Sequence, residues 1–125
     1  MKYKQIIKGQ VPSKSNCYKV ITIHGHGSLA KQEVLKEYER NFFRQCTIRG
    51  LNITGYFKIE VYVYFRSMRS DLDNASKIIL DCLQACKVIK NDNRNMEEHK
   101  WKFVDEKDPR IEFVISDDFT KSKDL

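Results

Sequence analysis

The sequence predicts a single α+β domain in which a mixed β-sheet is packed by two main helices. Apolar residues alternate with polar or charged residues across positions 57–66, as in a strand that buries one face. Apolar residues recur at three- and four-residue spacing across positions 30–46 and 74–87, which indicates two amphipathic helices. Strand-like segments flank both helices, so the expected order is β, small hairpin, α, β, α, β, β.

The first half of the chain is expected to supply an outer strand, the hairpin and the first helix. Residues 2–8 form a strand, and a polar loop rich in turn-forming residues continues to residue 18. Residues 19–24 form a short strand, which a turn with two glycines and two histidines reverses. Ser28 is the expected N-cap of the first helix.

The second half is expected to complete the sheet. The strand at 57–66 turns its apolar set toward the core and two tyrosines, Tyr62 and Tyr64, outward, where they either join a dimer contact or lie under a helix. Two final strands are predicted at residues 99–104 and 110–116. Sheet periodicity assigns four aromatic residues to the core: Phe57, Trp101, Phe103 and Phe113.

Length and composition favour one globular domain, predicted to span residues 1–116, with a flexible tail at 117–125. No apolar run approaches the ~20 residues that a membrane-spanning helix needs, and the amino terminus lacks the apolar block of a signal peptide. A cytoplasmic protein with no membrane partner is therefore expected. The four cysteines form no CxxC pair and have no histidine at zinc-ligand spacing, which favours buried thiols in a reducing compartment.

The chain is basic, with a net charge of +6 at pH 7 and a pI of about 9.1. A basic surface favours polyanionic partners, with nucleic acid ahead of an anionic membrane. Composition therefore argues against membrane-spanning and disulfide-rich secreted proteins and makes nucleic acid the leading class of partner.

Three aspartates flank the second predicted helix, and the stability of a solvent-exposed helix does not require all of them. Asp71 and Asp73 stand at the predicted strand-to-helix junction, and Asp92 follows one helix and a return loop later. A hard cation such as Mg²⁺ takes oxygen ligands, usually one or two carboxylates with water and phosphate. Lys77, one helical turn beyond Asp73, would present its ammonium group to a phosphate held by that cation. Such a set suits metal-assisted hydrolysis of a phosphodiester.

The residues alone leave simpler readings open. An aspartate before a helix is often its N-cap, worth ~1 kcal/mol, which explains Asp71 or Asp73 but not both. Lys77 and Asp81 match an i,i+4 ion pair worth ~0.3 kcal/mol, and residues 91–93 match a polar turn. An EF-hand loop starting at Asp71 is excluded, because its third-ligand, glycine and bidentate-acid positions hold other residue types.

The motif DLDNASK at residues 71–77, with Asp81 and Asp92 downstream, resembles the signature of the RusA family of Holliday-junction resolvases. In that family a DxDNxxK motif precedes a helix, and an aspartate from an acidic pair follows the helix. Residues 12–16, PSKSN, resemble the early PPSxN segment of the family. Chain length and the predicted order of elements also match, so the resemblance covers nearly the whole chain.

The resemblance implies a homodimeric endonuclease, dependent on Mg²⁺ or Mn²⁺, that cuts four-way DNA junctions in recombination and repair and is often encoded by phages and prophages. It implies that Asp71, Asp73 and Asp92 are the metal-binding catalytic acids and that Lys77 is the catalytic lysine. Two departures stand out: Asn91 replaces the first aspartate of the acidic pair, and the early segment holds a single proline. Because Asp92 keeps the ligand position, these departures bear on ligand geometry and metal preference.

Contacts to DNA phosphates are expected from basic residues near the motif, and such contacts give affinity without reading sequence. The residues expected to bind DNA are Lys14, Arg69, Lys90 and Arg94. A twofold dimer would offer two equal sites to a roughly twofold junction. Two alternatives stay open: a non-catalytic basic DNA-binding protein that retains the fold, suggested by Asn91, and a nuclease for other branched DNA.

Overall fold

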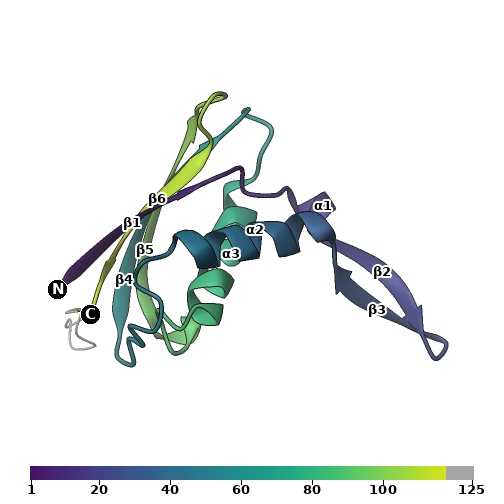
Figure 1. Ribbon diagram of the computed structural model, residues 1–125, viewed down its shortest axis with the longest axis horizontal. Coiled ribbons are helices and arrows are strands. Elements are labelled where there is room, and N and C mark those ends of the chain that lie inside the picture. The colour runs from purple at the N-terminus through teal and green to yellow at the C-terminus, as the bar shows by residue number, and fades with distance from the viewer. Residues whose placement is uncertain (118–125) are drawn as a thin grey trace.

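The structure, a computed structural model, describes residues 1–117 and packs helices against one face of a sheet (Figure 1). The strands are β1 (Lys2–Lys8), β2 (Tyr18–Ile23), β3 (His26–Lys31), β4 (Phe57–Phe65), β5 (Asn95–Val104) and β6 (Arg110–Ser116). The helices are α1 (Lys14–Cys17), α2 (Glu33–Gln45) and α3 (Leu72–Ala85), with one 3₁₀ turn, η1 (Asp92–Arg94). This order confirms the predicted mixed α+β fold with two main helices.

Four strands form the main sheet in the order β1-β6-β4-β5. β6 pairs with β1 and with β4 in antiparallel fashion, whereas β4 and β5 are parallel. Parallel neighbours need a crossover connection, and α3 supplies it between β4 and β5. The start of α3 consequently follows the carboxyl end of β4, where ligands commonly bind in sheets with parallel strands.

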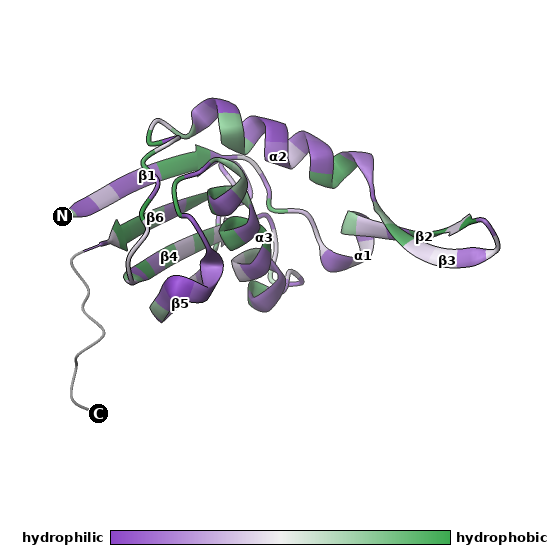
Figure 2. Ribbon diagram, turned by 90° about the horizontal axis from the view of Figure 1, so that it is seen from below, coloured by the Kyte–Doolittle hydropathy of each residue, from purple (hydrophilic) through white to green (hydrophobic). Residues whose placement is uncertain are grey.

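The core lies between the sheet and the helices α2 and α3. The inward residues of β4 are all buried, as the alternation predicts; they are Phe57, Ile59, Val61, Val63 and Phe65. On α2, Phe42 stacks on Phe113 of β6 with ring centroids 6.1 Å apart. Figure 2 shows hydrophilic and hydrophobic bands alternating along α2, as in an amphipathic surface helix. Burial of each large side chain contributes about 1.5–3 kcal/mol, so packing fixes the helices on the sheet.

β2 and β3 form a separate two-stranded hairpin that projects away from the main sheet (Figures 1 and 2). His24 and Gly25 have φ angles of 50° and 80°, and two consecutive positive φ angles define the tight type I′ turn that favours hairpins. The prediction that Ser28 caps the first helix is wrong, because Ser28 pairs with Ile21 inside the hairpin. The strand pairing keeps the chain extended to Lys31, and α2 begins only after it.

The sheet face away from α2 and α3 carries a row of aromatic side chains. Trp101 and Phe103 of β5 stand beside Tyr62 and Tyr64 of β4, and we call these four residues the aromatic strip. Trp101 and Phe103 are 40% and 42% exposed, so their predicted place in the core is wrong. They share the register of the two tyrosines on an edge strand, and strand alternation turns all four side chains to the uncovered face. The tyrosines therefore do not lie under a helix.

Several boundaries differ from the sequence prediction. The helix α1 occupies part of the predicted loop, and α3 begins at Leu72 instead of Asn74. β5 begins at Asn95 instead of His99, because its first residues continue the parallel pairing with β4. The four cysteines are free and buried, as predicted.

The two ends of the described chain meet at the edge of the sheet. The side chain of Asp117 accepts a hydrogen bond from the Tyr3 hydroxyl at 3.3 Å and lies 3.1 Å from the amino-terminal nitrogen of Met1. The rest of the predicted tail, residues 118–125, lies outside the described residues. Within residues 1–117, no helix is long and apolar enough to cross a membrane.

Candidate functional site

The start of α3 carries Asp71 and Asp73. Asp71 is the N-cap, and its Oδ1 accepts a hydrogen bond from the backbone N–H of Asp73 at 2.9 Å. Asp71 therefore does act as a helix cap, as the simpler reading expected. A carboxylate has several further acceptor positions, and the Asp71 side chain is exposed, so the cap leaves it able to bind a cation as well.

Two distant segments fix the turn between β4 and α3. Lys102 of β5 donates through Nζ to the carbonyl oxygens of Met68 at 2.7 Å and Ser70 at 2.6 Å. On the other side, Oε1 of Gln10 accepts a hydrogen bond from the backbone N–H of Arg66 at 2.9 Å. The direction in which the Asp71 side chain leaves this turn thus depends on residues far from it in sequence. Neither Gln10 nor Lys102 was singled out by the sequence, because neither belongs to a motif.

The early segment that resembles the PPSxN sequence lies beside the motif. Nδ2 of Asn74, in the first turn of α3, donates to the carbonyl oxygen of Pro12 at 2.9 Å. The DLDNASK motif and the PSKSN segment are therefore in direct contact through one asparagine. A side-chain amide at position 74 joins the two parts of the chain that carry the resemblance.

Asp73 forms an ion pair with Lys100 of β5. Lys100 Nζ lies 2.9 Å from Asp73 Oδ1, and the Asp73 side chain is 87% exposed. An exposed pair of this kind is worth ~0–1 kcal/mol, so a divalent cation can compete with the ammonium group for the carboxylate. Sequence reasoning missed Lys100, because its only signal is its place on the strand that pairs with β4.

Lys77, Asp81 and Asp92 form an electrostatic group along the flank of α3. Partial burial raises the pKa of Asp81, the nearby Lys77 ammonium opposes that rise, and the negative charge of Asp92 adds to it. Asp92 opens η1, and its backbone N–H donates to Oε1 of Gln84 at 3.0 Å. Gln84 thereby ties the return loop to α3 and sets Asp92 near the carboxylate of Asp81.

The side chains of the three predicted metal ligands, Asp71, Asp73 and Asp92, do not come together in one cluster. Among residues 1–117, no three His, Cys, Asp or Glu side chains form a group that could hold a metal ion. Asp71 and Asp73 belong to the start of α3, whereas Asp92 is tied to Gln84 further along the helix. Carboxylate oxygens nevertheless suit Mg²⁺ or Mn²⁺, and Mg²⁺ commonly takes only one or two carboxylates with water and phosphate oxygens. The assignment of these acids as metal ligands stays a prediction.

Two of the four predicted DNA-binding residues line one pocket. A polar pocket of about 350 Å³ next to η1 is lined by Thr54, Lys90, Asn91, Asn93 and Arg94. The Arg94 guanidinium also lies over the ring of Tyr56, 5.3 Å from the ring centroid. Lys14 begins α1 and Arg69 lies in the β4–α3 turn, and both side chains are exposed. In sequence, Arg69 precedes Asp71 by two residues, and Lys90 and Arg94 flank Asp92.

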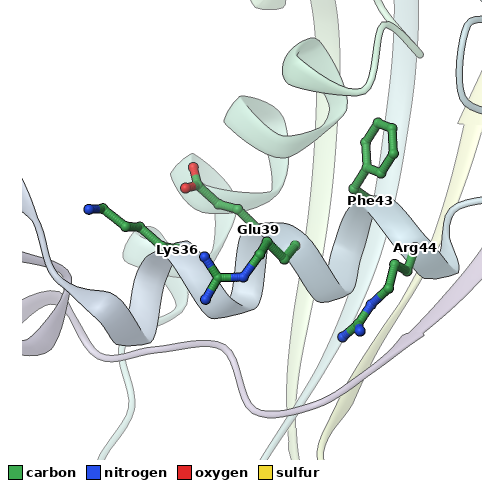
Figure 3. Close-up of a pocket in the computed structure, with 5 residues that line it drawn as sticks. Lys36, Glu39, Phe43 and Arg44 are labelled. Atoms are coloured by element: carbon green, nitrogen blue, oxygen red, sulfur yellow. The ribbon is translucent and has the colours of Figure 1, made fainter.

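A second pocket is shallow and lies on the exposed surface of α2 (Figure 3). Its lining residues are Lys36, Glu39, Arg40, Phe43 and Arg44. Arg40 is already paired with Glu33 and Glu37, at 2.6 Å from each. The charges in this pocket are mixed, and Arg40 is already paired with carboxylates. The pocket on α2 is therefore a poorer phosphate-binding site than the pocket beside η1.

Fold and site together define an α+β domain in which exposed carboxylates, lysines and a basic pocket surround one helix after a parallel strand. The family model for endodeoxyribonuclease RusA matches residues 24–116, and the chain belongs to this family. A comparison with curated proteins finds no match. The family makes this chain a nuclease that cuts within DNA strands, and it confirms the resemblance based on the motif. The match contains Asp71, Asp73, Lys77 and Asp92 and begins after the early segment.

Proposed function

We propose that this chain is a divalent-metal-dependent endonuclease that resolves four-way DNA junctions by paired phosphodiester hydrolysis. The observation that carries the proposal is the RusA-family match over a helix whose start and flank present exposed carboxylates and a lysine. In this proposal Asp71, Asp73 and Asp92 are the metal-binding acids, with Mg²⁺ as the ion and Mn²⁺ as a substitute. Lys77 is the catalytic lysine.

The site residues divide the chemistry among them. A bound divalent ion polarises a phosphoryl oxygen and lowers the pKa of a water molecule. Asp71 and Asp73 would hold the ion from the start of α3, where Lys102 orients their turn. Lys77, one turn further, would keep its ammonium group beside the phosphate oxygens as negative charge develops on them. Asp92 would approach from the η1 side, next to the pocket that contains Lys90.

Basic residues around these acids would hold the DNA backbone. All four proposed residues are exposed, and two of them line the pocket beside η1, which supports their proposed contacts with phosphates; they are Lys14, Arg69, Lys90 and Arg94. Contacts of this type release counterions, so binding should weaken steeply as the salt concentration rises. A homodimer would supply the two sites that paired cuts require.

The decisive experiment incubates the purified chain with a labelled four-way junction in Mg²⁺, with an EDTA control. We expect symmetrical cuts in Mg²⁺ and none in EDTA. Flap and linear duplex DNA of matched sequence serve as competitors, and preferential cutting of a flap would instead identify a nuclease for other branched DNA. Junction binding without any cleavage in Mg²⁺ or Mn²⁺ would contradict the proposal.

A non-catalytic DNA-binding protein is the second candidate. Two observations favour it: Asn91 stands in place of an acid, and no group of three metal-ligating side chains is assembled within residues 1–117. Restoring the acid with Asn91→Asp separates the two functions. If Asn91 has removed activity, the substitution should create cleavage where the natural sequence has none.

A further inference from the structure

We propose that the DNA-binding surface continues past η1 into a second pocket, where Lys87 binds a backbone phosphate of the strand beside Asp92. The choice of DNA as the ligand rests on the proposed function. The location of the contact rests on the pockets, their charges and the backbone conformation at the end of α3. Lys87 lies outside the proposed catalytic set, so its contact supplies affinity and takes no part in the chemical step.

The second pocket shares Lys90 with the pocket beside η1. Its volume is about 540 Å³, and its lining residues are Gly50, Asn52, Gln84, Lys87, Ile89 and Lys90. Gln84 also accepts the backbone N–H of Asp92 at 3.0 Å, so this pocket lies next to one of the proposed metal-binding acids. The shared lysine joins the two pockets into one surface, which we call the pocket pair.

The pocket pair is basic, with no carboxylate among the described residues that line it. Its charged groups are Lys87, Lys90 and Arg94, and its other polar side chains are amides and one hydroxyl. Within residues 1–117, none of these three cations takes part in a salt bridge. A row of cations without carboxylate partners suits a polyanion with regularly spaced charges, and the backbone of a nucleic acid is such a ligand.

Backbone hydrogen bonds fix the chain on both sides of the second pocket. The backbone N–H of Asn52 donates to the carbonyl oxygen of Lys87 at 2.8 Å, and Ile53 forms a parallel bridge with Ile89. The backbone N–H of Lys90 donates to the carbonyl oxygen of Ile53 at 2.9 Å. Both lysines of the pocket therefore start from a backbone that is already ordered, which lowers the entropic cost of binding a ligand there.

Lys87 occupies a position at which glycine would fit the backbone better. It follows the C-cap of α3, and its N–H donates to the carbonyl oxygen of Gln84 at 3.0 Å. The next N–H, from Val88, donates to the carbonyl oxygen of Leu83 at 3.0 Å. These two bonds define a Schellman motif, whose left-handed residue is usually glycine. The φ angle of Lys87 is 57°, so a lysine carries left-handed strain at the edge of a basic pocket. Strained residues cluster at binding sites, which favours a role for this side chain in the pocket.

Lys87→Gly separates binding from folding. Glycine adopts a left-handed conformation without steric cost, so the variant should melt at the same temperature as the natural chain or higher, followed by circular dichroism. Its affinity for a labelled four-way junction is measured by fluorescence anisotropy in EDTA, where cleavage is stopped. At 0.1 M salt we expect an affinity loss of about tenfold, and the slope of log affinity against log salt concentration should become shallower by about one. Unchanged affinity and an unchanged slope would overturn the proposal.

A matched control removes a lysine from the pocket on α2. Lys36→Gln also lowers the net charge by one, but Lys36 shares its pocket with Glu39 (Figure 3). This variant should bind the junction nearly as well as the natural chain. Equal losses in Lys36→Gln and Lys87→Gly would assign the effect to net charge and refute a local contact.

A double variant tests whether the two pockets act as one surface. Lys87→Gly combined with Lys90→Gln should make the salt slope shallower by about two, because two phosphate contacts are lost. The loss should be the same for junctions of different base sequence, because phosphate contacts carry no sequence information. A loss that changes with the base sequence would assign the second pocket to base reading and overturn the backbone contact.

The readouts keep this proposal separate from the proposed function. If the natural chain cuts the junction in Mg²⁺ but Lys87→Gly binds normally, the contact is wrong and the activity stands. If Lys87→Gly binds weakly but the natural chain cuts no DNA, the contact stands and the activity is wrong. If both hold, Lys87→Gly should raise KM by about tenfold and leave kcat unchanged, because the lost contact binds substrate and transition state equally.

Discussion

Replacing Asp71 tests whether its carboxylate has a role beyond capping α3. Its Oδ1 accepts the backbone N–H of Asp73 at 2.9 Å, so Asp71→Ala removes the cap and should cost about 1 kcal/mol. For a domain of this size that corresponds to about 3–5 °C in Tm. Asp71→Asn keeps an acceptor for the same bond and loses only the favourable effect of the negative charge at the helix start, about 0.3–1 kcal/mol.

The two variants should differ in stability but not in activity. If Asp71 binds the metal ion, both should reduce junction cleavage by about 100-fold or more, equivalent to about 2.7 kcal/mol of transition-state stabilisation. Cleavage rates in Mg²⁺ and thermal melting by circular dichroism are the measurements, and junction binding should survive in both. Asp108→Asn, in the exposed turn before β6, is the matched control and should keep full activity. Asp71→Asn with nearly normal cleavage would refute the catalytic role and leave the cap alone.

Two further predictions follow from the ion pair at the site and from the buried thiols. Lys100→Gln removes the cation paired with Asp73 at 2.9 Å, so Mn²⁺ affinity measured by calorimetry should rise by up to about fivefold; weaker Mn²⁺ binding would show that Lys100 supports the site instead of competing there. Burial raises the pKa of the Cys86 thiol to about 11, so little thiolate forms near neutral pH. A thiol reagent at pH 8 should therefore label Cys86 slowly in the native chain and rapidly in denaturant, and prompt native labelling would contradict its burial.

The sequence predicted the elements whose pattern depends on the chain segment itself. The alternation from Phe57 to Phe65 specified both the strand and its buried face, and the spacing of apolar residues located α2 and α3. Trp101 and Phe103 were misassigned because alternation gives two faces without saying which one a helix covers. That choice depends on β5 being an edge strand in register with Tyr62 and Tyr64, which only the tertiary fold determines.

The candidate site shows the same division between local and long-range information. The motif identified Asp71, Asp73 and Lys77, because their spacing around one helix start is local. Lys100 and Lys102 come from another strand and carry no motif, so only the parallel pairing of β4 with β5 reveals them. The position of Asp92 near Gln84 depends on the course of the return loop, which residue types alone do not specify.

The hydrogen bonds that hold the β4–α3 turn come from residues far away in the sequence, so the turn becomes ordered only when those distant segments have folded. Lys102 reaches the carbonyl of Ser70 across 32 residues, and Gln10 reaches Arg66 across 56. Contacts between such distant segments form late, after the cost of closing long loops has been met. A nascent or truncated chain that ends before residue 102 would contain every motif residue but lack the lysine that orients them. We therefore expect a chain truncated before residue 102 to lack the ordered β4–α3 turn.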